Sequence, residues 1–491
     1  MSKLRRFTGP AKSAPVSAVK PLAAAVQGAV DPLQVSYTKV GEHRGQRRLW
    51  LEGGRLAAAG FEAGTRYHVV FDVDTRTIAL EINPAGDRQV SGRRRVGQER
   101  PTPILDLAGA DVTDIVGEAG SVRALLSKGR IVFSLHPRDV AKAEREARVR
   151  EHVKEGFVTE GTLCAGAGIA TLGVATGIEE SGLLSRVEWI VDRERKYLEV
   201  AATNNPAVTS ETKIYEASLE ELEPALIGRV DVLQVSLPCT GHSKSGKAKR
   251  GLAHAEDHPT DALVVFGALR LMDAVQPSVV ISENVTDAAN SATYALFRAY
   301  LKDAGYQVFE KVMDEKNAGT IERRERWWFV AISDGLAPGF DLAALPSRAR
   351  QYRVLGDALE RLPADDPQWR RHDYLDVKQE RDEAAGKGFR RQFVHEESEV
   401  VGTVTKGYSK RRSTDPFVQR EDGMERLLTP TEHARVKGIP EGIVDGLSDT
   451  TAHEVLGQSI LLPHAQILGK AIGQHLQAQV EDDEPRPVFG I

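Results

Sequence analysis

The chain has 491 residues, with 65 Lys and Arg against 70 Asp and Glu, a formal net charge of −5, and 41% hydrophobic residues. Such a length predicts about two to four domains with enough apolar core to fold without cross-links. Its two cysteines, Cys164 and Cys239, exclude a disulfide framework and a four-cysteine zinc site, and no long apolar run suggests a membrane span or an export signal, so we expect a cytoplasmic protein with no metal site and no membrane contact.

The chain opens with two segments of different texture. Residues 1–33 are rich in Ala, Pro and Val, and so few bulky side chains predict a disordered tail. Over residues 34–138, short alternating runs separated by glycine turns predict a small β-rich domain, which loosely resembles the swapped-hairpin barrels of antitoxin-type transcription factors. Its arginine runs favour a solvated charged face, with extra DNA contacts or dimerisation as open alternatives.

A linker helix is predicted next, over residues 139–156, where charged residues and alanines alternate at helical spacing. From residue 157, strand-like apolar runs alternate with amphipathic helices, which predicts βαβ units and a mostly parallel sheet. We expect this α/β core to comprise residues 157–335 and 425–480, followed by a short tail, 481–491. A polar, arginine-rich module over residues 336–424 interrupts it. Because the sequence pI is only about 6.3, any affinity for nucleic acid must come from such local basic regions.

A glycine-rich turn follows the first apolar run of the core. Gly166 and Gly168 let the backbone approach a ligand closely where a strand passes into a helix. The next apolar run ends in Asp192, a residue placed to accept hydrogen bonds from ribose hydroxyls. The pair indicates a nucleoside-containing cofactor, although a glycine turn by itself is equally consistent with close packing.

A cysteine in a loop provides the candidate nucleophile. The buried-strand run that starts at Val230 ends at Pro238, which fixes the chain direction and presents Cys239. The thiolate is the reactive form of cysteine, and nearby cations favour it. Basic residues follow at once in a Gly/Ser-rich stretch: Lys244, Lys247, Lys249 and Arg250.

Two further strand ends carry charge. The run from Ser278 ends in Glu283 and Asn284, at the same sheet edge as Cys239 if their strands are neighbours. Arginines then enter another strand at Arg324 and Arg326. Each feature alone also fits an ordinary surface glutamate or a salt-bridged edge strand.

In this order, the glycine turn, Pro-Cys, Glu-Asn-Val and Arg-x-Arg blocks resemble the cytosine-C5 DNA methyltransferase family. Two blocks near the carboxyl end, Arg426–Pro440 and Gly457–Ile460, extend the resemblance over about residues 158–475. It implies a Rossmann-like class I methyltransferase core, S-adenosylmethionine (S-adenosyl-L-methionine) as cofactor, duplex DNA as substrate, and a target-recognition role for residues 336–424.

The resemblance also implies catalytic roles. Cys239 adds to carbon 6 of cytosine, Glu283 neutralises charge developing toward ring N3, and Arg324 binds the O2 edge. Asn284 holds the loop, and the target base is flipped out of the duplex. The DNA-binding residues it implies are Ser243, Lys244, Lys247, Arg250, Arg326, Lys410, Arg411 and Arg412.

For the cofactor, the resemblance implies residues in the glycine turn, at following strand ends and in the last block. They are Cys164, Ala165, Gly166, Gly168, Ile169, Asp192, Arg193, Glu216, Pro238, Gln458 and Ser459. Cys164 and Arg193 stand where the family usually has aromatic residues around adenine, which implies either a thinner clamp, with Trp189 or Tyr197 compensating, or a modified cofactor. Glu322 replaces a glutamine common at its position.

The leading hypothesis is therefore a DNA (cytosine-5-)-methyltransferase acting in restriction–modification, with a cognate restriction endonuclease as partner, in phage self-protection or alone. One alternative is the tRNA-acting branch of the superfamily, whose members tend to carry a further cysteine motif that this chain lacks after Cys239. The other is a catalytically degenerate DNA-binding regulator.

Overall fold

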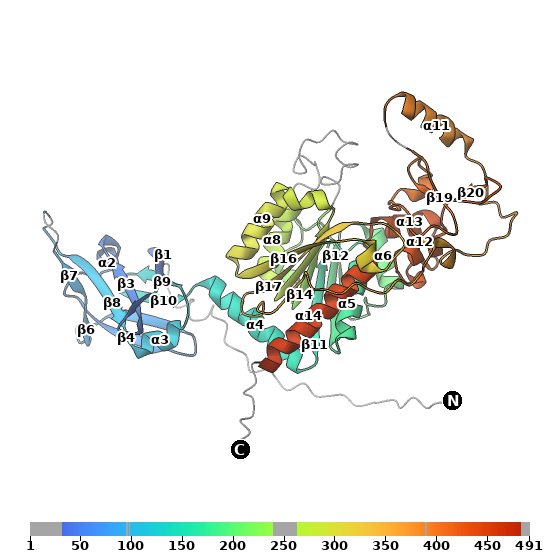
Figure 1. Ribbon diagram of the computed structural model, residues 1–491. Helices are drawn as coiled ribbons and strands as arrows, with labels where there is room; N and C mark the ends of the chain where they lie inside the picture. The colour runs from blue at the N-terminus through green and yellow to red at the C-terminus, as the bar shows by residue number, and fades with distance from the viewer. Residues whose placement is uncertain (1–31, 95–96, 98, 239–262, 388–389, 483–491) are drawn as a thin grey trace, which may run out of the picture. The chain divides into compact units, whose positions relative to one another are not determined.

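The structure is a computed structural model that describes residues 32–94, 97, 99–238, 263–387 and 390–482 (Figure 1). Most of both predicted tails, 1–33 and 481–491, lies outside this range; only residues 32, 33, 481 and 482 of them are described. Cys239, Ser243, Lys244, Lys247 and Arg250 also lie outside it. The chain divides into two compact units between Ala141 and Lys142. None of the described helices has the length and apolarity needed to cross a membrane.

The first unit is built from two antiparallel sheets around one apolar core. Its sheets have the orders β1-β9-β10-β5-β4-β6 and β2-β3-β8-β7. Leu49 and Leu105 from the smaller sheet pack with Ile78, Leu126 and Ile131 from the larger one. The strands are β1 (Gln34–Lys39), β2 (Gly41–His43), β3 (Gln46–Glu52), β4 (Arg66–Asp72), β5 (Thr77–Ile82), β6 (Arg88–Gln89), β7 (Ser91–Arg93), β8 (Thr102–Ala108), β9 (Ser121–Ser127) and β10 (Arg130–Leu135), with helices α2 (Gly54–Ala58) and α3 (Ala110–Val116).

Two arginines of this unit are already paired with carboxylates. Arg48 lies 2.7 Å from Asp106, and Arg93 lies 2.7 Å from Glu52. Exposed pairs of this kind contribute little to stability, because water and salt screen them. Such pairs are typical of a solvated charged face. They leave fewer arginines of this unit available to bind phosphate than the sequence alone indicates.

The second unit contains a seven-stranded sheet of order β13-β12-β11-β14-β15-β17-β16. Strands β11 to β15 run parallel to one another. Strand β17 lies between β15 and β16 and is antiparallel to both. This confirms the predicted Rossmann-like fold. The strands are β11 (Phe157–Leu163), β12 (Leu184–Asp192), β13 (Lys213–Glu216), β14 (Val232–Val235), β15 (Val279–Asn284), β16 (Tyr306–Met313) and β17 (Arg326–Ser333).

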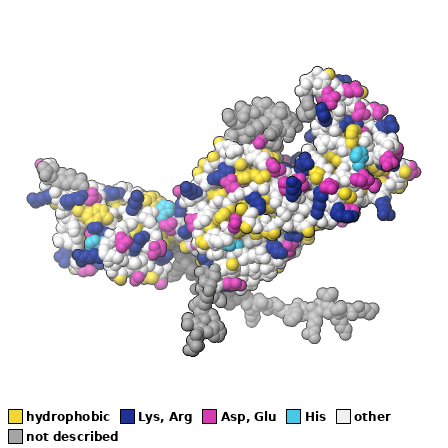
Figure 2. Space-filling model, in the orientation of Figure 1, with side chains coloured by type: hydrophobic (Ala, Val, Ile, Leu, Met, Phe, Trp, Pro, Cys, Tyr) yellow, Lys and Arg dark blue, Asp and Glu magenta, His cyan; other side chains and the backbone are white. Residues whose placement is uncertain are grey.

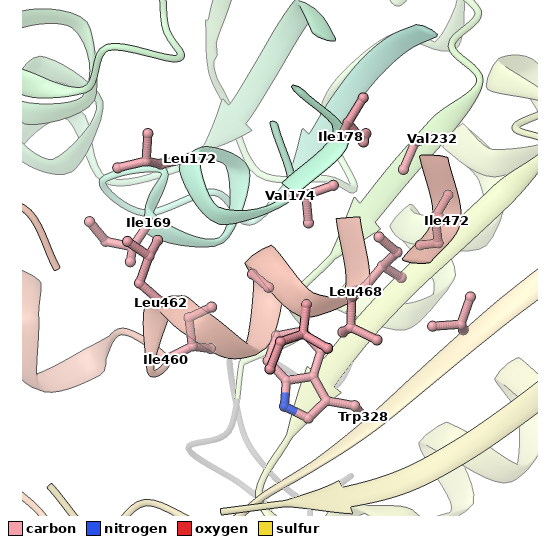
Figure 3. Close-up of a cluster of buried hydrophobic side chains, with 14 of the residues drawn as sticks. Ile169, Leu172, Val174, Ile178, Val232, Trp328, Ile460, Leu462, Leu468 and Ile472 are labelled. Atoms are coloured by element: carbon pink, nitrogen blue, oxygen red, sulfur yellow. The ribbon is translucent and has the colours of Figure 1, made fainter. Parts of the chain in front are cut away.

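Helices cover both faces of this sheet, because its strands are apolar on both sides. On one face, Leu172 of α5 and Leu468 of α14 belong to one apolar cluster with Trp328 of β17 (Figure 3). On the other, helices α8 and α9 pack against Phe329. The backbones of α5 and α14 are so close that a Cβ at Gly177 would lie 2.2 Å from a carbonyl oxygen of α14. The helices of this unit are α4 (Pro137–Lys154), which continues from the first unit, α5 (Ile169–Glu180), α6 (Arg195–Asn204), α8 (Val264–Val275), α9 (Ala292–Asp303), α10 (Glu315–Ala318) and α14 (Leu462–Asp482).

The inserted module, residues 336–424, contributes β18 and β19 to a small three-stranded sheet of order β18-β19-β20. The module's apolar side chains, including Leu355 and Tyr408, share a core with Val436 of α12, which anchors the module to the α/β core. The elements here are α11 (Asp373–Ala384), β18 (Gln392–Val394), β19 (Pro416–Gln419), β20 (Glu425–Arg426), α12 (Pro430–Val436) and α13 (Asp449–Gln458), with 3₁₀ turns η4 (Leu355–Asp357), η5 (Tyr408–Lys410) and η6 (Glu441–Val444); η1 (Pro224–Leu226) and η3 (Thr286–Asn290) lie in the core.

Two predicted boundaries differ from the observed ones. Helix α4 spans Pro137–Lys154 rather than 139–156, and α14 continues to Asp482, beyond the predicted end of the core at 480. Helix α4 begins at Pro137, where the His136 ring nitrogen accepts the Arg138 N–H, and it ends two residues before Gly156, whose φ is +85°.

Candidate active site

Three predicted site segments lie at one edge of the seven-stranded sheet. Strand β14 pairs in parallel with β11 on one side and β15 on the other. The glycine turn after β11, Pro238 after β14 and Glu283 at the end of β15 are therefore brought to the carboxyl edge of the sheet, the usual ligand site of such folds. The predicted nucleophile, Cys239, follows Pro238 and lies outside the described residues.

Glu283 is a largely buried carboxyl group, with 16% of its side chain exposed. Burial raises its pKa, although Arg326, Arg324 and Lys437 act in the opposite direction. The Nε of Arg326 lies 3.5 Å from Oε2, and that oxygen has no hydrogen-bond partner among the described residues. The group is thus suited to hold or share a proton more readily than an exposed glutamate does.

Asn284 ties β15 to the segment that leads into Cys239. Its side-chain amide donates to the carbonyl of Leu237 at 2.9 Å and to the hydroxyl of Tyr294 at 3.1 Å. Its oxygen accepts the Val285 N–H. Tyr294, a fully buried side chain on α9, belongs to no motif, and the sequence analysis missed it.

Arg324 is 2% exposed and links three segments of the chain. Its Nε donates to Glu322 Oε1 at 2.9 Å, and its Nη2 donates to the carbonyls of Val404 at 2.8 Å and Gly457 at 2.9 Å. These three hydrogen bonds are made by Nε and Nη2, and none of them uses Nη1. The arginine that pairs with Glu283 is Arg326, two residues further along the chain and the first residue of β17.

The glycine turn has the backbone conformation that a close ligand requires. Gly166 and Gly168 have φ angles of +56° and +71°, and the turn leads directly into α5, whose first N–H groups are unpaired within the helix. Asp192 Oδ2 accepts the Gly166 N–H at 2.7 Å. Asn205 donates to the carbonyls of Ala167 at 3.1 Å and Gly168 at 2.8 Å, so this missed residue holds the turn in place.

The other predicted cofactor residues surround this turn. Asp192 pairs in register with Glu216 on the neighbouring strand, and Gln458 Nε2 lies 3.6 Å from the position a Cβ on Gly166 would occupy. Ala165 and Ile169 flank the glycines, and Cys164 has a φ of +57°. Carboxylates, an amide and the N–H groups at the start of α5 form a donor and acceptor set that fits the ribose and amino acid parts of S-adenosylmethionine.

The two aromatic side chains expected to stack on adenine, Trp189 and Tyr197, are both buried. Trp189 is 1% exposed; it packs over Gly161 and donates to the Gly228 carbonyl, so its assignment to an adenine clamp is wrong. Tyr197 is also buried, with the Lys196 and Lys406 ammonium groups each 4.9 Å from its ring centroid. An alternating strand pattern could not reveal that β12 is covered on the Trp189 side.

In the inserted module, the predicted DNA-binding cations Lys410, Arg411 and Arg412 lie in and after η5. Arg411 has a φ of +50°, and burial, together with Arg370, lowers its pKa. Other module arginines pair with carboxylates, as Arg348 does with Glu180, and basic and acidic side chains are intermixed on the face shown in Figure 2. The arginine content of the module therefore overstates the number of cations available to DNA.

We expect Gly168→Ala to weaken cofactor binding at least about 10-fold and to destabilise the fold by about 1–3 kcal/mol. Its Cβ would lie 2.6 Å from Asn205 Nδ2, at a φ that disfavours side chains. Titration calorimetry with S-adenosylhomocysteine and urea unfolding measure the two effects. Gly446→Ala, at a φ of +72° with nothing within 4 Å, is the matched control; an equal loss of cofactor affinity there would contradict the prediction.

The fold and this edge define the chain as a Rossmann-like methyltransferase of class I. Residues 159–474, more than half of the chain, match the model of the C-5 cytosine-specific DNA methylase family, and the chain belongs to that family. It is accordingly a DNA (cytosine-5-)-methyltransferase that uses S-adenosylmethionine as methyl donor.

Individual relatives agree with this assignment. The chain is 28% identical over 266 residues to the type II methyltransferase M.NlaX of Neisseria lactamica, covering 52% of this chain and 79% of that one. It is 26% identical over 282 residues to M.HpaII of Haemophilus parainfluenzae, covering 53% and 76%. Among solved structures, the Entamoeba histolytica methyltransferase EhMeth shares the fold with a TM-score of 0.50 and 16% identity, covering 67% of this chain and 99% of that one.

Proposed function

We propose that the chain methylates a flipped cytosine in duplex DNA through a covalent bond between Cys239 and carbon 6, with Glu283 and Arg324 as catalytic partners. One observation carries the proposal. The Asn284 side chain of β15 holds the Leu237 carbonyl at 2.9 Å, which joins the strand bearing Glu283 to the segment that enters Pro238 and Cys239.

The residue types suit the chemistry, because carbon 5 of cytosine is a poor nucleophile. The Cys239 thiolate forms a bond to carbon 6, and the ring electrons shift toward N3, where the Glu283 carboxyl places its proton. The raised pKa of Glu283 supports this role, as does Arg326 beside it, which orients the carboxyl. Arg324, through Nη1, meets the O2 edge of the base.

S-adenosylmethionine, when bound, supplies an electrophilic methyl group on its sulfonium sulfur. Gly166, Gly168, Asp192, Glu216 and Gln458 are the residues that would hold it, with the main-chain N–H groups of the turn toward its carboxylate. Once carbon 5 carries the methyl group, its proton leaves to a base. The bond to Cys239 then breaks, and N3 returns its proton to Glu283.

Recognition of DNA falls to the inserted module and to the residues after Cys239. Lys410, Arg411 and Arg412 contact the duplex, with arginine able to read guanine and lysine placed at phosphates. Flipping the base costs a few kcal/mol, which these contacts offset. Type II names among the relatives support a restriction–modification role in the cytoplasm beside a cognate endonuclease. The first unit adds DNA contacts or dimerises.

The decisive experiment incubates the full chain with labelled S-adenosylmethionine and either duplex DNA or tRNA. Label on cytosine in duplex DNA supports the proposal, whereas label on tRNA alone would replace the substrate. A duplex containing 5-fluorocytosine then tests the covalent step, since fluorine cannot leave as a proton and the protein stays bonded to DNA. Failure to form that adduct while ordinary cytosine is methylated would overturn the Cys239 mechanism.

A further inference from the structure

Lys437, which follows α12, has no exposed surface. Lysine is almost never fully buried unless it is paired, and this one has two partners. Its Nζ lies 3.3 Å from Glu322 Oε2 and donates to the Ser459 carbonyl at 3.2 Å. Burial lowers the pKa of Lys437 well below its ordinary value, and Arg324 acts in the same direction while Glu322 opposes it.

Glu322 joins this lysine to the active site. It is also fully buried, and its Oε1 accepts hydrogen bonds from Arg324 Nε at 2.9 Å and from the Val404 N–H at 3.3 Å. Two cations and one carboxylate are thus removed from water together. The desolvation cost of such a cluster can exceed its Coulombic gain, so stability alone is a weak reason for its presence.

The cluster lies where three segments converge. Arg324 donates to the carbonyls of Val404, in the inserted module, and Gly457, near the end of α13. These two backbones touch, because a Cβ at Gly457 would lie 2.4 Å from the carbonyl of Thr405. Lys437 holds the Ser459 carbonyl, directly after Gln458, which lies beside the cofactor turn. A shift at Lys437 would therefore move both the arginine at the base and the turn at the cofactor.

We propose that Lys437 is a positioning residue for methyl transfer: through Glu322 and the Ser459 carbonyl it fixes Arg324 and the Gln458–Ser459 turn relative to each other. The inference rests on the roles proposed above for Arg324 and Gln458. The Glu322 carboxylate supplies the counter-charge that the buried Lys437 ammonium needs.

A double-mutant cycle tests the proposal with Glu322→Gln, Lys437→Gln and the two combined. In Glu322→Gln the Lys437 ammonium and the Arg324 guanidinium lose their shared counter-charge, and in Lys437→Gln the Glu322 carboxylate keeps only Arg324 as its partner. We therefore expect kcat to fall at least about 30-fold in each single variant while KM for duplex DNA changes less than about 3-fold. In the double variant, the amide that replaces the Glu322 carboxylate can still accept from Arg324, and the amide that replaces the Lys437 ammonium can still donate to the Ser459 carbonyl. The kcat of this variant is expected to return to within about 5-fold of wild type.

Asp231→Asn is the matched control. Asp231 is a fully buried carboxylate, 2.6 Å from His152 and 3.1 Å from Arg148, but it precedes β14 at the opposite edge of the sheet. This variant should lower Tm and leave kcat within about 2-fold of wild type. All rates are measured below the Tm of each variant, and if Lys437→Gln does not fold, Glu322→Gln and the double variant decide.

The inference is overturned if a folded single variant keeps wild-type kcat, or if the double variant is no more active than the weaker single one. It is also overturned if Asp231→Asn loses kcat as Lys437→Gln does, because the effect would then follow stability. Failure of the proposed mechanism is distinguishable, since it appears as a wild-type chain that forms no adduct with the 5-fluorocytosine duplex.

Discussion

Cys239→Ala is expected to abolish methyl transfer, with a loss of at least about 10⁴-fold in the single-turnover rate. Without the sulfur, no bond forms at carbon 6, and carbon 5 keeps the low nucleophilicity of an aromatic ring. The smaller side chain removes no DNA contact that we assign. Binding of duplex DNA, measured by fluorescence anisotropy, should therefore stay within about 3-fold of wild type.

The chain offers its own comparison for this variant, because it has only one other cysteine. Cys164→Ser retains Cys239 and should still form the adduct with a 5-fluorocytosine duplex, seen as a band of increased mass under denaturing conditions. Cys239→Ala should form none. An adduct that forms in Cys239→Ala and is missing in Cys164→Ser would show that Cys164, and not Cys239, is the nucleophile.

The layered fold follows from local patterns in the sequence. The runs at Val232–Val235 and Val279–Asn284 begin with apolar residues and are buried at nearly every position, as expected for a parallel sheet covered by helices on both sides. The order of the strands does not follow from such patterns. Strand β17 lies antiparallel between β15 and β16. This position depends on its pairing with β16 along its whole length, which the residue pattern of β17 alone does not indicate.

Within the site, the sequence predicted the right edge of the sheet but not every partner. Because β17 begins at Arg326, Arg324 lies before the strand and turns toward Val404 and Gly457, while Arg326 reaches Glu283. Which of two arginines at alternate positions meets the carboxylate depends on where the strand starts, and strand ends are poorly marked in sequence.

The missed residues have no local signature. Asn205, Tyr294 and Lys437 act on backbone or side chains that are distant in sequence: Asn205, for example, bonds a glycine 37 residues away. Their importance comes from burial, since a polar group removed from water must find a partner. Only the assembled core shows which partner that is.

Glu283→Gln is expected to lower kcat about 10²–10³-fold and to change the shape of its pH profile. Glutamine keeps the size of the side chain but cannot give a proton to ring N3. In wild type, the rate rises as the Cys239 thiol ionises and falls as the Glu283 carboxyl, whose pKa burial raises, loses its proton. The variant should keep the rising limb and lose the falling one, so that kcat reaches a plateau in alkaline solution. Initial rates across about pH 5.5–9 measure this.

Stability separates this chemical effect from a structural one. Because the pKa of Glu283 is raised on folding, the folded chain holds this proton more tightly than the unfolded chain does. That contribution to stability is complete below the ordinary glutamate range and is lost as the pH rises through the raised value. At pH values above the raised pKa of Glu283, Glu283→Gln should therefore be at least as stable as wild type in urea unfolding while remaining far less active. Glu310→Gln removes a carboxylate of β16 that pairs with Arg298 of α9, and this control should leave the pH profile unchanged. A falling limb that persists in Glu283→Gln would show that another group carries the proton.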